Sequence, residues 1–329
     1  MALALGRPSR RVFWTDLCVS AAVVYIALAG TVVLHGAWKL AFGMLGALAL
    51  YRAISFIHEL THVRSDELPG FNLAWNLLIG FPFLVPSFLY EGVHNIHHVQ
   101  QRYGTSDDPE YLQLSRSSVW GLIGFVAVGA LAPLGALLRF GVLAPVSWVI
   151  PQFRSLVLER YSAMVINPQF RRRDIVAGAW APWRTQELIC WLWCWSLIAM
   201  VVAGGVCARV VLTALVVMSV ATLVNQLRTL VAHAWESDGE PMSLCAQFID
   251  SVNVPPPGLA PLIWAPVGLR FHALHHLAPR VPYHNLAEAH RRLAASSTPE
   301  GIYHLANRGG LGQAIRTLVA KLRGRFSRG

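Results

Sequence analysis

The sequence predicts an all-α integral membrane protein, with two transmembrane helical hairpins and a cytosolic helical cap that holds a histidine-rich di-metal site. Three observations predict it. Hydrophobic residues make up 55% of the 329 positions. Charged residues make up only 13%, about half the share of roughly 25% that is usual in soluble domains. The histidines gather in three short boxes. This composition excludes a disordered chain, a coiled coil, collagen and a disulfide-stapled secreted domain.

The charge balance is basic, with 27 Lys and Arg against 17 Asp and Glu. A basic balance can indicate a nucleic-acid partner, but no basic stripe or recognition motif accompanies it here. We therefore expect no nucleic-acid partner. The positive-inside rule and attraction to anionic lipid heads account for the arginines.

The first hairpin is predicted from spans at about 14–35 and 38–57. The first run is long enough to cross a bilayer, and the arginines before it place the N-terminus inside. A signal peptide is the alternative, because Ala27 to Ala29 could form a cleavage site. The apolar run continues past that site, which favours a span. Arg52 interrupts the second run near its inner end, where its side chain can reach the interface.

The second hairpin is predicted at 188–208 and 210–227, with Arg209 between the two runs. Two further apolar stretches, 73–90 and 119–153, contain prolines and are interpreted as re-entrant or interfacial segments. If the last stretch crosses twice instead, the chain has six spans rather than four. Either arrangement returns the chain to the same side.

This topology puts both termini and most of the arginines on the inner side, in a single domain covering 1–329. Residues 310–329 form a basic amphipathic tail, which we expect to lie on the membrane surface. A docking site for a donor protein is the alternative for the tail. We expect an integral protein of the bacterial inner membrane whose termini and active site face the cytoplasm.

Nine histidines are candidate metal ligands, and each lies just inside the inner membrane surface in this topology. Spacings of three and four place the members of each box on one face of a helix. Adjacent pairs widen that face, so that each member of a pair can reach a different ion. The boxes are HELTH with His58 and His62, HNIHH with His94, His97 and His98, and HALHH with His272, His275 and His276; His233 is the ninth candidate, at the inner end of the fourth crossing.

Nine imidazoles are too many for one ion and suit two. Imidazole favours iron, copper, nickel or zinc, and no cysteine lies near the boxes as a structural zinc site would normally require. HELTH also matches the HExxH motif of zinc proteases, with Glu59 as base, but that mechanism leaves most of the other histidines unexplained. A metal transporter is disfavoured because the spans are nearly free of His, Asp and Glu at mid-depth.

HELTH, HNIHH and HALHH resemble the three histidine boxes of the membrane fatty acid desaturase superfamily. The segments YGTSDDPEY and HHLAPRVPYHNLAEAHRRL are similar to those of bacterial acyl-chain desaturases, and the resemblance covers about 45–310. It implies a helical bundle with two irons that use O2 and two external electrons to remove two hydrogens from an alkyl chain. It also implies that the eight box histidines are ligands, with His233 as an extra ligand found in some members.

Second-sphere partners of these histidines are expected among nearby acids and amides, because ligand histidines usually donate their other N–H to such groups. Asp107 and Asp108 are the leading candidates, and Glu59 is a further one. Where some members have an Asn one turn before the extra histidine, this chain has Thr229, and Asn225 lies two turns away. Arg102, Arg228 and Arg270 flank the boxes; they could hold a lipid head group, but positive-inside arginines are the favoured interpretation.

The predicted activity is desaturation of a fatty acyl chain in a lipid or thioester, by two irons with O2 as co-substrate. The alternative is a hydroxylase or ketolase of the same superfamily, because the ligand set is shared. No HPGG segment of a fused cytochrome b5 is found, so we expect a separate ferredoxin, rubredoxin or cytochrome to supply electrons. Zinc competes well for imidazole and could replace iron in a purified sample.

Overall fold

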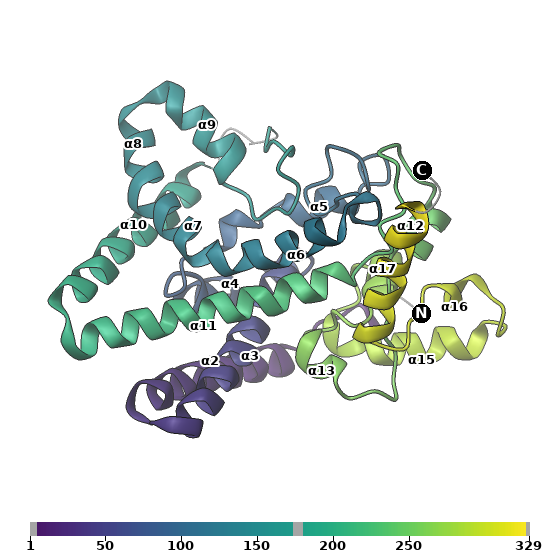
Figure 1. Ribbon diagram of the computed structural model, residues 1–329, viewed down its shortest axis with the longest axis horizontal. Coiled ribbons are helices and arrows are strands. Elements are labelled where there is room, and N and C mark those ends of the chain that lie inside the picture. Colours follow the sequence, from purple (N-terminus) through teal and green to yellow (C-terminus); the bar gives the residue numbers. More distant parts are fainter. Residues whose placement is uncertain (1–4, 174–179, 327–329) are drawn as a thin grey trace.

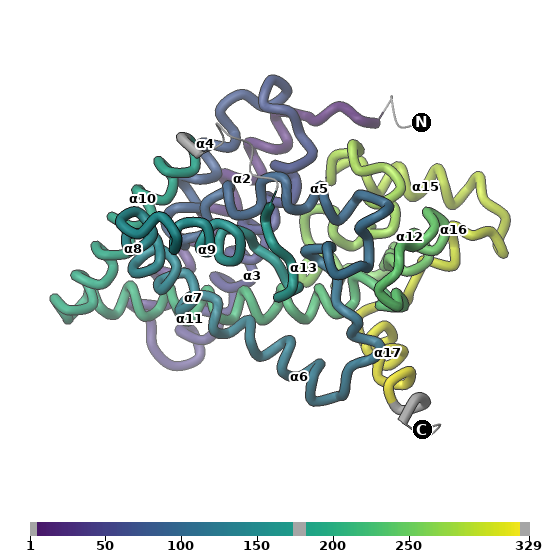
Figure 2. Tube along the Cα trace, turned by 90° about the horizontal axis from the view of Figure 1, so that it is seen from above, coloured from purple at the N-terminus to yellow at the C-terminus, as the bar shows by residue number. Residues whose placement is uncertain are grey.

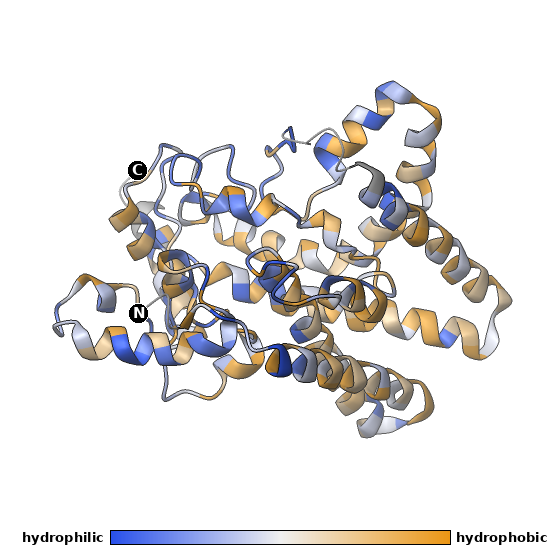
Figure 3. Ribbon diagram, turned by 180° about the vertical axis from the view of Figure 1, so that it is seen from behind, coloured by the Kyte–Doolittle hydropathy of each residue, from blue (hydrophilic) through white to orange (hydrophobic). Residues whose placement is uncertain are grey.

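The computed structural model describes residues 5–173 and 180–326, and its regular elements in those ranges are all helical (Figure 1). Long helices form one end of the molecule, and short helices and loops form the other. Figure 3 shows hydrophobic residues predominating along the long helices and hydrophilic residues gathered at the opposite end. The all-helical prediction is confirmed.

The first hairpin consists of α2 (Arg10–Val33) and α3 (Gly36–Leu60). Inside it, the Arg52 guanidinium pairs with Asp16, with 2.5 Å between Nη2 and Oδ2. An acid on the neighbouring helix thus neutralises the charge of Arg52, whose side chain stays partly exposed.

The second hairpin consists of α10 (Trp180–Ala203) and α11 (Gly205–Leu230). The turn between them lies at Gly204 and Gly205, several residues before the Arg209 that the sequence suggested. Both glycines have positive φ, +72° and +59°, which a residue without a side chain adopts readily. Arg209 instead lies on the exposed surface of α11.

The segment between α3 and the second box is short and broken. It contains α4 (Phe71–Trp75), the π-helical turn η1 (Asn76–Gly80) and the 3-10 turn η2 (Ser87–Leu89). The Asn76 side chain closes this segment, since its Oδ1 accepts from the Ser87 amide at 2.9 Å and its Nδ2 donates to Ser87 Oγ at 2.8 Å. The second box follows on α5 (Val93–His97), and the 3-10 turn η3 (Leu114–Arg116) comes next.

The apolar stretch at 119–149 is helical throughout but bends. It comprises α6 (Val119–Val128), η4 (Gly129–Leu131), α7 (Ala132–Leu138), η5 (Arg139–Leu143) and α8 (Ala144–Val149), and α9 (Pro151–Tyr161) follows. Its contacts first follow α11 away from the histidines and then follow α10 back. Hydrogen bonds join Gln226 to Phe125, Thr222 to Gly129, Cys194 to Leu137 and Arg139 to Glu187. Both ends of the stretch therefore lie toward the same end of the α10–α11 pair.

Five helical segments are long and apolar enough to cross a membrane, and they mark the chain as an integral membrane protein. These are Arg10–Val33, Gly36–Leu60, Val119–Val149, Pro182–Ala203 and Gly205–Leu230. Four belong to the two hairpins, and the bent segment is the fifth.

The C-terminal third gathers at the end of α11 opposite its turn with α10 (Figure 2). It contains α12 (Leu244–Asp250), α13 (Pro261–Trp264), α14 (His272–Leu277), η6 (Tyr283–Asn285), α15 (Leu286–Ser296), α16 (Ile302–Leu305) and α17 (Leu311–Phe326). Leu318 and Leu322 of α17 are buried in one cluster with Tyr103 and Trp235. Part of the apolar face of the tail thus packs on the protein; that the tail lies on the membrane surface stays a prediction.

Candidate metal centre

The first box lies at the end of α3. His58 is in the last turn of the helix, and the Thr61 hydroxyl donates to its carbonyl at 2.7 Å. His62 follows just past the helix end, so both side chains leave α3 on the same side. Their ring centroids are 5.2 Å apart.

The second box occupies the short helix α5 and its C-terminal cap. Gly92, with φ +72°, precedes the helix and turns the chain into it. His94 and His97 share one face, since they are three residues apart. His98 caps the helix, and its Nε2 lies 2.9 Å from Nε2 of His94.

The third box occupies α14, and His233 reaches it from the loop after α11. Backbone pairing fixes that loop, because the Val252 amide donates to the Ala232 carbonyl at 2.9 Å. The Leu274 amide in α14 donates to Asn253 Oδ1 at 3.0 Å. These bonds hold His233 against α14.

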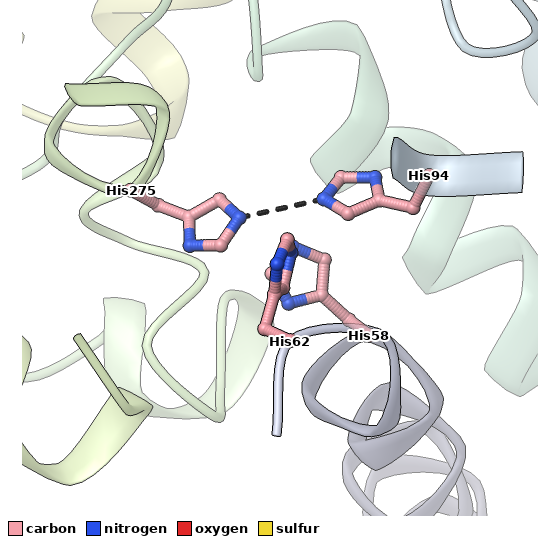
Figure 4. Close-up of side chains that lie close together, drawn as sticks. All are labelled: His58, His62, His94 and His275. Carbon is pink, nitrogen blue, oxygen red and sulfur yellow. Dashed lines mark hydrogen bonds between the residues drawn. The ribbon is translucent and has the colours of Figure 1, made fainter. Parts of the chain in front are cut away.

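All nine predicted histidines come together at one place. Eight of them form two groups of four, and within each group one nitrogen of every ring lies within 4.8 Å of the others. The ninth, His98, contacts both groups: its Nε2 is 3.1 Å from His275 Nε2, and its ring centroid is 4.5 Å from that of His276. Figure 4 shows the first group converging from three separate elements. The groups are His58, His62, His94 and His275, and His97, His233, His272 and His276.

The donor atoms fit metal ions. An imidazole nitrogen binds zinc at about 2.0–2.1 Å, so two ligands of one ion lie roughly 3–4 Å apart. The Nε2 atoms of His233 and His272 face each other at 3.0 Å, and those of His94 and His275 at 3.4 Å. The Nε2 atoms of His58, His62 and His97 are also buried without a hydrogen-bond partner among the described residues, which is costly unless a cation occupies the space. Nδ1 of His272 and of His275 is likewise unpartnered, but in these two rings Nε2 is the atom that faces the other histidines.

Two of the histidines turn their outer nitrogen to a carboxylate. His97 Nδ1 is 2.9 Å from both carboxylate oxygens of Asp108, and both side chains are fully buried. His94 Nδ1 is 2.9 Å from Oε1 of Glu110. A donated Nδ1–H fixes the tautomer and leaves the Nε2 lone pair directed at the cluster.

His233 is supported through a tyrosine. The hydroxyl of Tyr103 lies 2.8 Å from His233 Nδ1 and donates to Asp250 Oδ2 at 2.8 Å. The carboxylate itself is 3.7 Å from Nδ1. This arrangement also leaves Nε2 as the inward-facing lone pair.

Burial keeps most of the rings neutral, which metal binding requires. Burial, with the charges of neighbouring histidines, holds the pKa of His94, His272 and His275 well below the ordinary value. Burial also lowers the pKa of His97, but the charge of Asp108 and the hydrogen bond to it outweigh this and raise the pKa overall. Burial raises the pKa of Glu110 to about 6.

Some of the predicted supporting residues contact a histidine and others do not. Asp108 has the expected contact, whereas Asp107 is exposed and its amide donates to Thr105 Oγ1. Glu59 is buried with Oε1 3.5 Å from His58 Nδ1, and its Oε2 accepts from the Tyr283 amide at 3.0 Å.

Asn225 and Thr229 border a cavity beside the histidines. The Thr229 hydroxyl donates to the Asn225 carbonyl at 2.8 Å. Neither side chain is hydrogen bonded to a histidine among the described residues.

Glu110, Tyr103 and Asp250 are the functional residues that sequence reasoning missed. Glu110 lies in the YGTSDDPEY segment that follows the second box, so its proximity to that box could have indicated a supporting role. Asp250 carries no motif, and only the pairing of its segment with 232–234 brings it to His233.

A cavity of about 570 Å³ opens from the candidate metal ligands into the helices. His58, His94, His233 and His272 border one end. The rest of the wall is largely apolar and comes from α3, the bent segment, α11 and the segments 84–90 and 160–166. Such a cavity can hold an extended apolar molecule beside the histidines while excluding water.

Comparison with known proteins shows the family to which the chain belongs. Residues 31–306 match the sequence model of the family described as fatty acid desaturase. A protein of Caulobacter vibrioides (strain NA1000 / CB15N), named ceramide hydroxylase, is 50% identical over 324 residues, which cover 97% of this chain and 91% of that protein. No solved structure matches the chain.

Proposed function

The chain belongs to the fatty acid desaturase family, and from this premise we propose that it is an O2-dependent hydroxylase of ceramide-type lipids. That it is a membrane oxidoreductase acting on lipids follows from the family and from its hydroxylase relative. The observation that carries the finer proposal is the relative's name, at 50% identity along nearly the whole chain. The desaturase that the sequence analysis put first is therefore the second candidate.

We propose two irons, one for each group of four histidines. The nine imidazoles, the unpartnered ring nitrogens and the carboxylates behind His94 and His97 support this assignment. No cysteine lies in either group, which argues against a structural zinc site. When bound, iron would supply the activation of O2 that attack on an unactivated C–H bond requires.

The reaction proposed is R–H + O2 + 2 e⁻ + 2 H⁺ → R–OH + H2O. The chain's own residues hold the alkyl chain in the cavity, exclude water from it and keep the ring nitrogens in the tautomer that ligates. Asp108, Glu110 and the Tyr103–Asp250 pair do the last of these. The electrons come from a separate donor protein of the ferredoxin, rubredoxin or cytochrome type.

We also propose that the metal centre faces the cytoplasm. The histidines of the first two boxes converge with His233 and the histidines of α14. The chain between the second box and His233 must therefore cross the membrane an even number of times. The α10–α11 hairpin accounts for two crossings, and the bent segment at 119–149 returns toward the end of the hairpin from which it started. The arginines before α2 then set the inner side.

Mass spectrometry of ceramides tests the proposal. The full-length protein, loaded with iron and supplied with ceramide, O2 and a reduced ferredoxin, should yield ceramide that is heavier by one oxygen atom. His97→Ala is the matched inactive control. Product that is lighter by two hydrogens would make the protein a desaturase. Unchanged ceramide, in a sample that holds two irons and oxidises the reduced donor, would overturn the proposed substrate.

A further inference from the structure

Arg228 is a charged side chain placed inside the substrate cavity. It lies in the last turn of α11 and borders the same cavity as His58, His94 and His272. Besides burial, its charge contributes to the low pKa of His233 and His272. The guanidinium therefore sits at the metal end of the cavity.

Few groups of the protein satisfy this guanidinium. An arginine has five N–H donors. Among the residues that the structure describes, one hydrogen bond is found, from Nη2 to the Leu269 carbonyl at a long 3.3 Å. No ion pair within that part of the chain includes Arg228. The charge of Glu110, which borders the same cavity, acts on Arg228, but that carboxylate pairs with His94 instead. A half-buried cation with spare donors therefore favours a ligand that supplies acceptors.

Arg139 also borders the cavity, but its charge is already neutralised by Glu187, although its Nη1 has no hydrogen-bond partner among the described residues. Its Nη2 is 2.5 Å from Glu187 Oε1, and its Nε donates to the Tyr161 carbonyl at 2.5 Å. Arg160 borders the cavity as well, but it is exposed. Arg228 is thus the half-buried cation at the cavity that pairs with no carboxylate among the described residues and keeps donors for a molecule in the cavity.

The wall divides into two chemical regions. Asn225 and Thr229 lie on the same helix as Arg228 and make the metal end polar. The wall toward the bent segment is mostly apolar and includes Gly135, Ala136 and Met218, with Arg139 paired to Glu187. A lipid fits this division with its polar linkage beside the histidines and its alkyl chain toward the bent segment.

We propose that Arg228 binds the amide carbonyl oxygen of the lipid substrate, so that oxidation falls on a carbon close to the polar end of the lipid rather than in mid-chain. This rests on the proposed function and names the part of the substrate that faces the metal centre. Arg228 acts here as a positioning residue, because it orients the lipid and takes no part in the bond changes.

Binding to the intact protein tests the contact without requiring turnover. The probes are ceramide and its thioamide analogue, in which sulfur, a weak hydrogen-bond acceptor, replaces the carbonyl oxygen. The wild type should prefer ceramide severalfold. Arg228→Gln should weaken ceramide binding by about tenfold or more, as expected for loss of a hydrogen bond to a charged group, and should bind both probes alike.

Arg209→Gln is the matched control, because Arg209 lies exposed on the same helix, near its other end. Arg228→Lys keeps the charge and should retain part of the preference. Equal binding of both probes by the wild type would overturn the proposal even if no variant folds. A preference that disappears in Arg160→Gln and survives in Arg228→Gln would overturn it too.

The position of the new hydroxyl gives a second readout. Fragmentation of the product should place it within a few carbons of the amide in the wild type, and Arg228→Gln should spread it along the chain. A single mid-chain position would contradict the inference while leaving ceramide hydroxylation intact. If the protein forms no hydroxylated ceramide, the binding comparison still decides the role of Arg228.

Discussion

The Nδ1 atom of His97 lies 2.9 Å from both carboxylate oxygens of Asp108, and neither side chain is exposed to solvent. The same carboxylate accepts from the backbone amides of Gly104 and Glu110, each at 2.8 Å. Asp108 is therefore held rigidly, and it holds the His97 ring in turn. This buried pair orients one member of the second histidine group.

Replacement of Asp108 by Asn should weaken metal binding. The amide keeps the size of the side chain but removes the charge that favours a donated Nδ1–H, and losing such support typically costs 10–100-fold in metal affinity or activity. Asp107→Asn is the matched control, because Asp107 is exposed and contacts no histidine in the described part of the chain. Metal content measured after equilibration with a competing chelator should fall for Asp108→Asn alone. Equal loss in the two variants would contradict a specific role for the pair.

The two groups of four predict different effects for neighbouring histidines. His98 belongs to neither group of four, so His98→Ala should leave two metals bound, with the metal beside His94 and His275 held more weakly because His98 Nε2 lies close to Nε2 of both. His97→Ala removes a member of the second group and should leave one. Metal analysis of both purified variants, with iron as the only metal supplied, gives the two stoichiometries. Loss of a metal from His98→Ala, with retention of two in His97→Ala, would reverse this division.

The boxes and the predicted topology were sufficient to place the nine histidines together. Their spacing puts the rings of a box on one side of a short element, and two hairpins bring the three inner segments to one end. The supporting acids depend on loops that carry no such periodicity. Asp108 was predicted from its distance along the chain, but Asp250 reaches His233 only through backbone pairing.

The conformation of the bent segment also could not be predicted in full from the sequence. Its apolar length was evident, and both interpretations of it returned the chain to one side. The bend itself depends on contacts with α10 and α11, including the buried pair of Arg139 and Glu187. Arg228 is a third case: its charge suggested the inner surface, and only the cavity wall places it inside the protein.

The metal-free protein should lose stability as the pH falls below about 6.5. Burial lowers the pKa of His94, His272 and His275 in the folded state, so these rings stay neutral while the unfolded chain takes up protons. Each such histidine costs about 1 kcal/mol of stability per pH unit in that range. His97 and Glu110 oppose the trend, because the pKa of each is raised in the folded state.

Thermal unfolding of chelator-treated protein between pH 8 and pH 5 measures this dependence. The midpoint should be level near pH 8 and should fall toward pH 5. A variant carrying His272→Gln and His276→Gln should show a shallower fall, because it takes up fewer protons on unfolding. A midpoint that rises on acidification would contradict the predicted sign.

Gly135 should limit the length of alkyl chain that the cavity accepts. It lies in α7 and borders the cavity, and a Cβ added there would meet nothing within 4 Å. Gly135→Phe should therefore fill the apolar end without displacing the protein, and replacing a helical glycine does not weaken the helix. The expected result is reduced turnover of the longest acyl chains with little change for shorter ones.

Gly124→Phe is the matched control, since Gly124 is also helical and open but does not border the cavity. Competition between ceramides of different acyl length, followed by mass spectrometry of the products, measures the preference. A uniform loss across all lengths in Gly135→Phe would mean that this end of the cavity does not hold the tail.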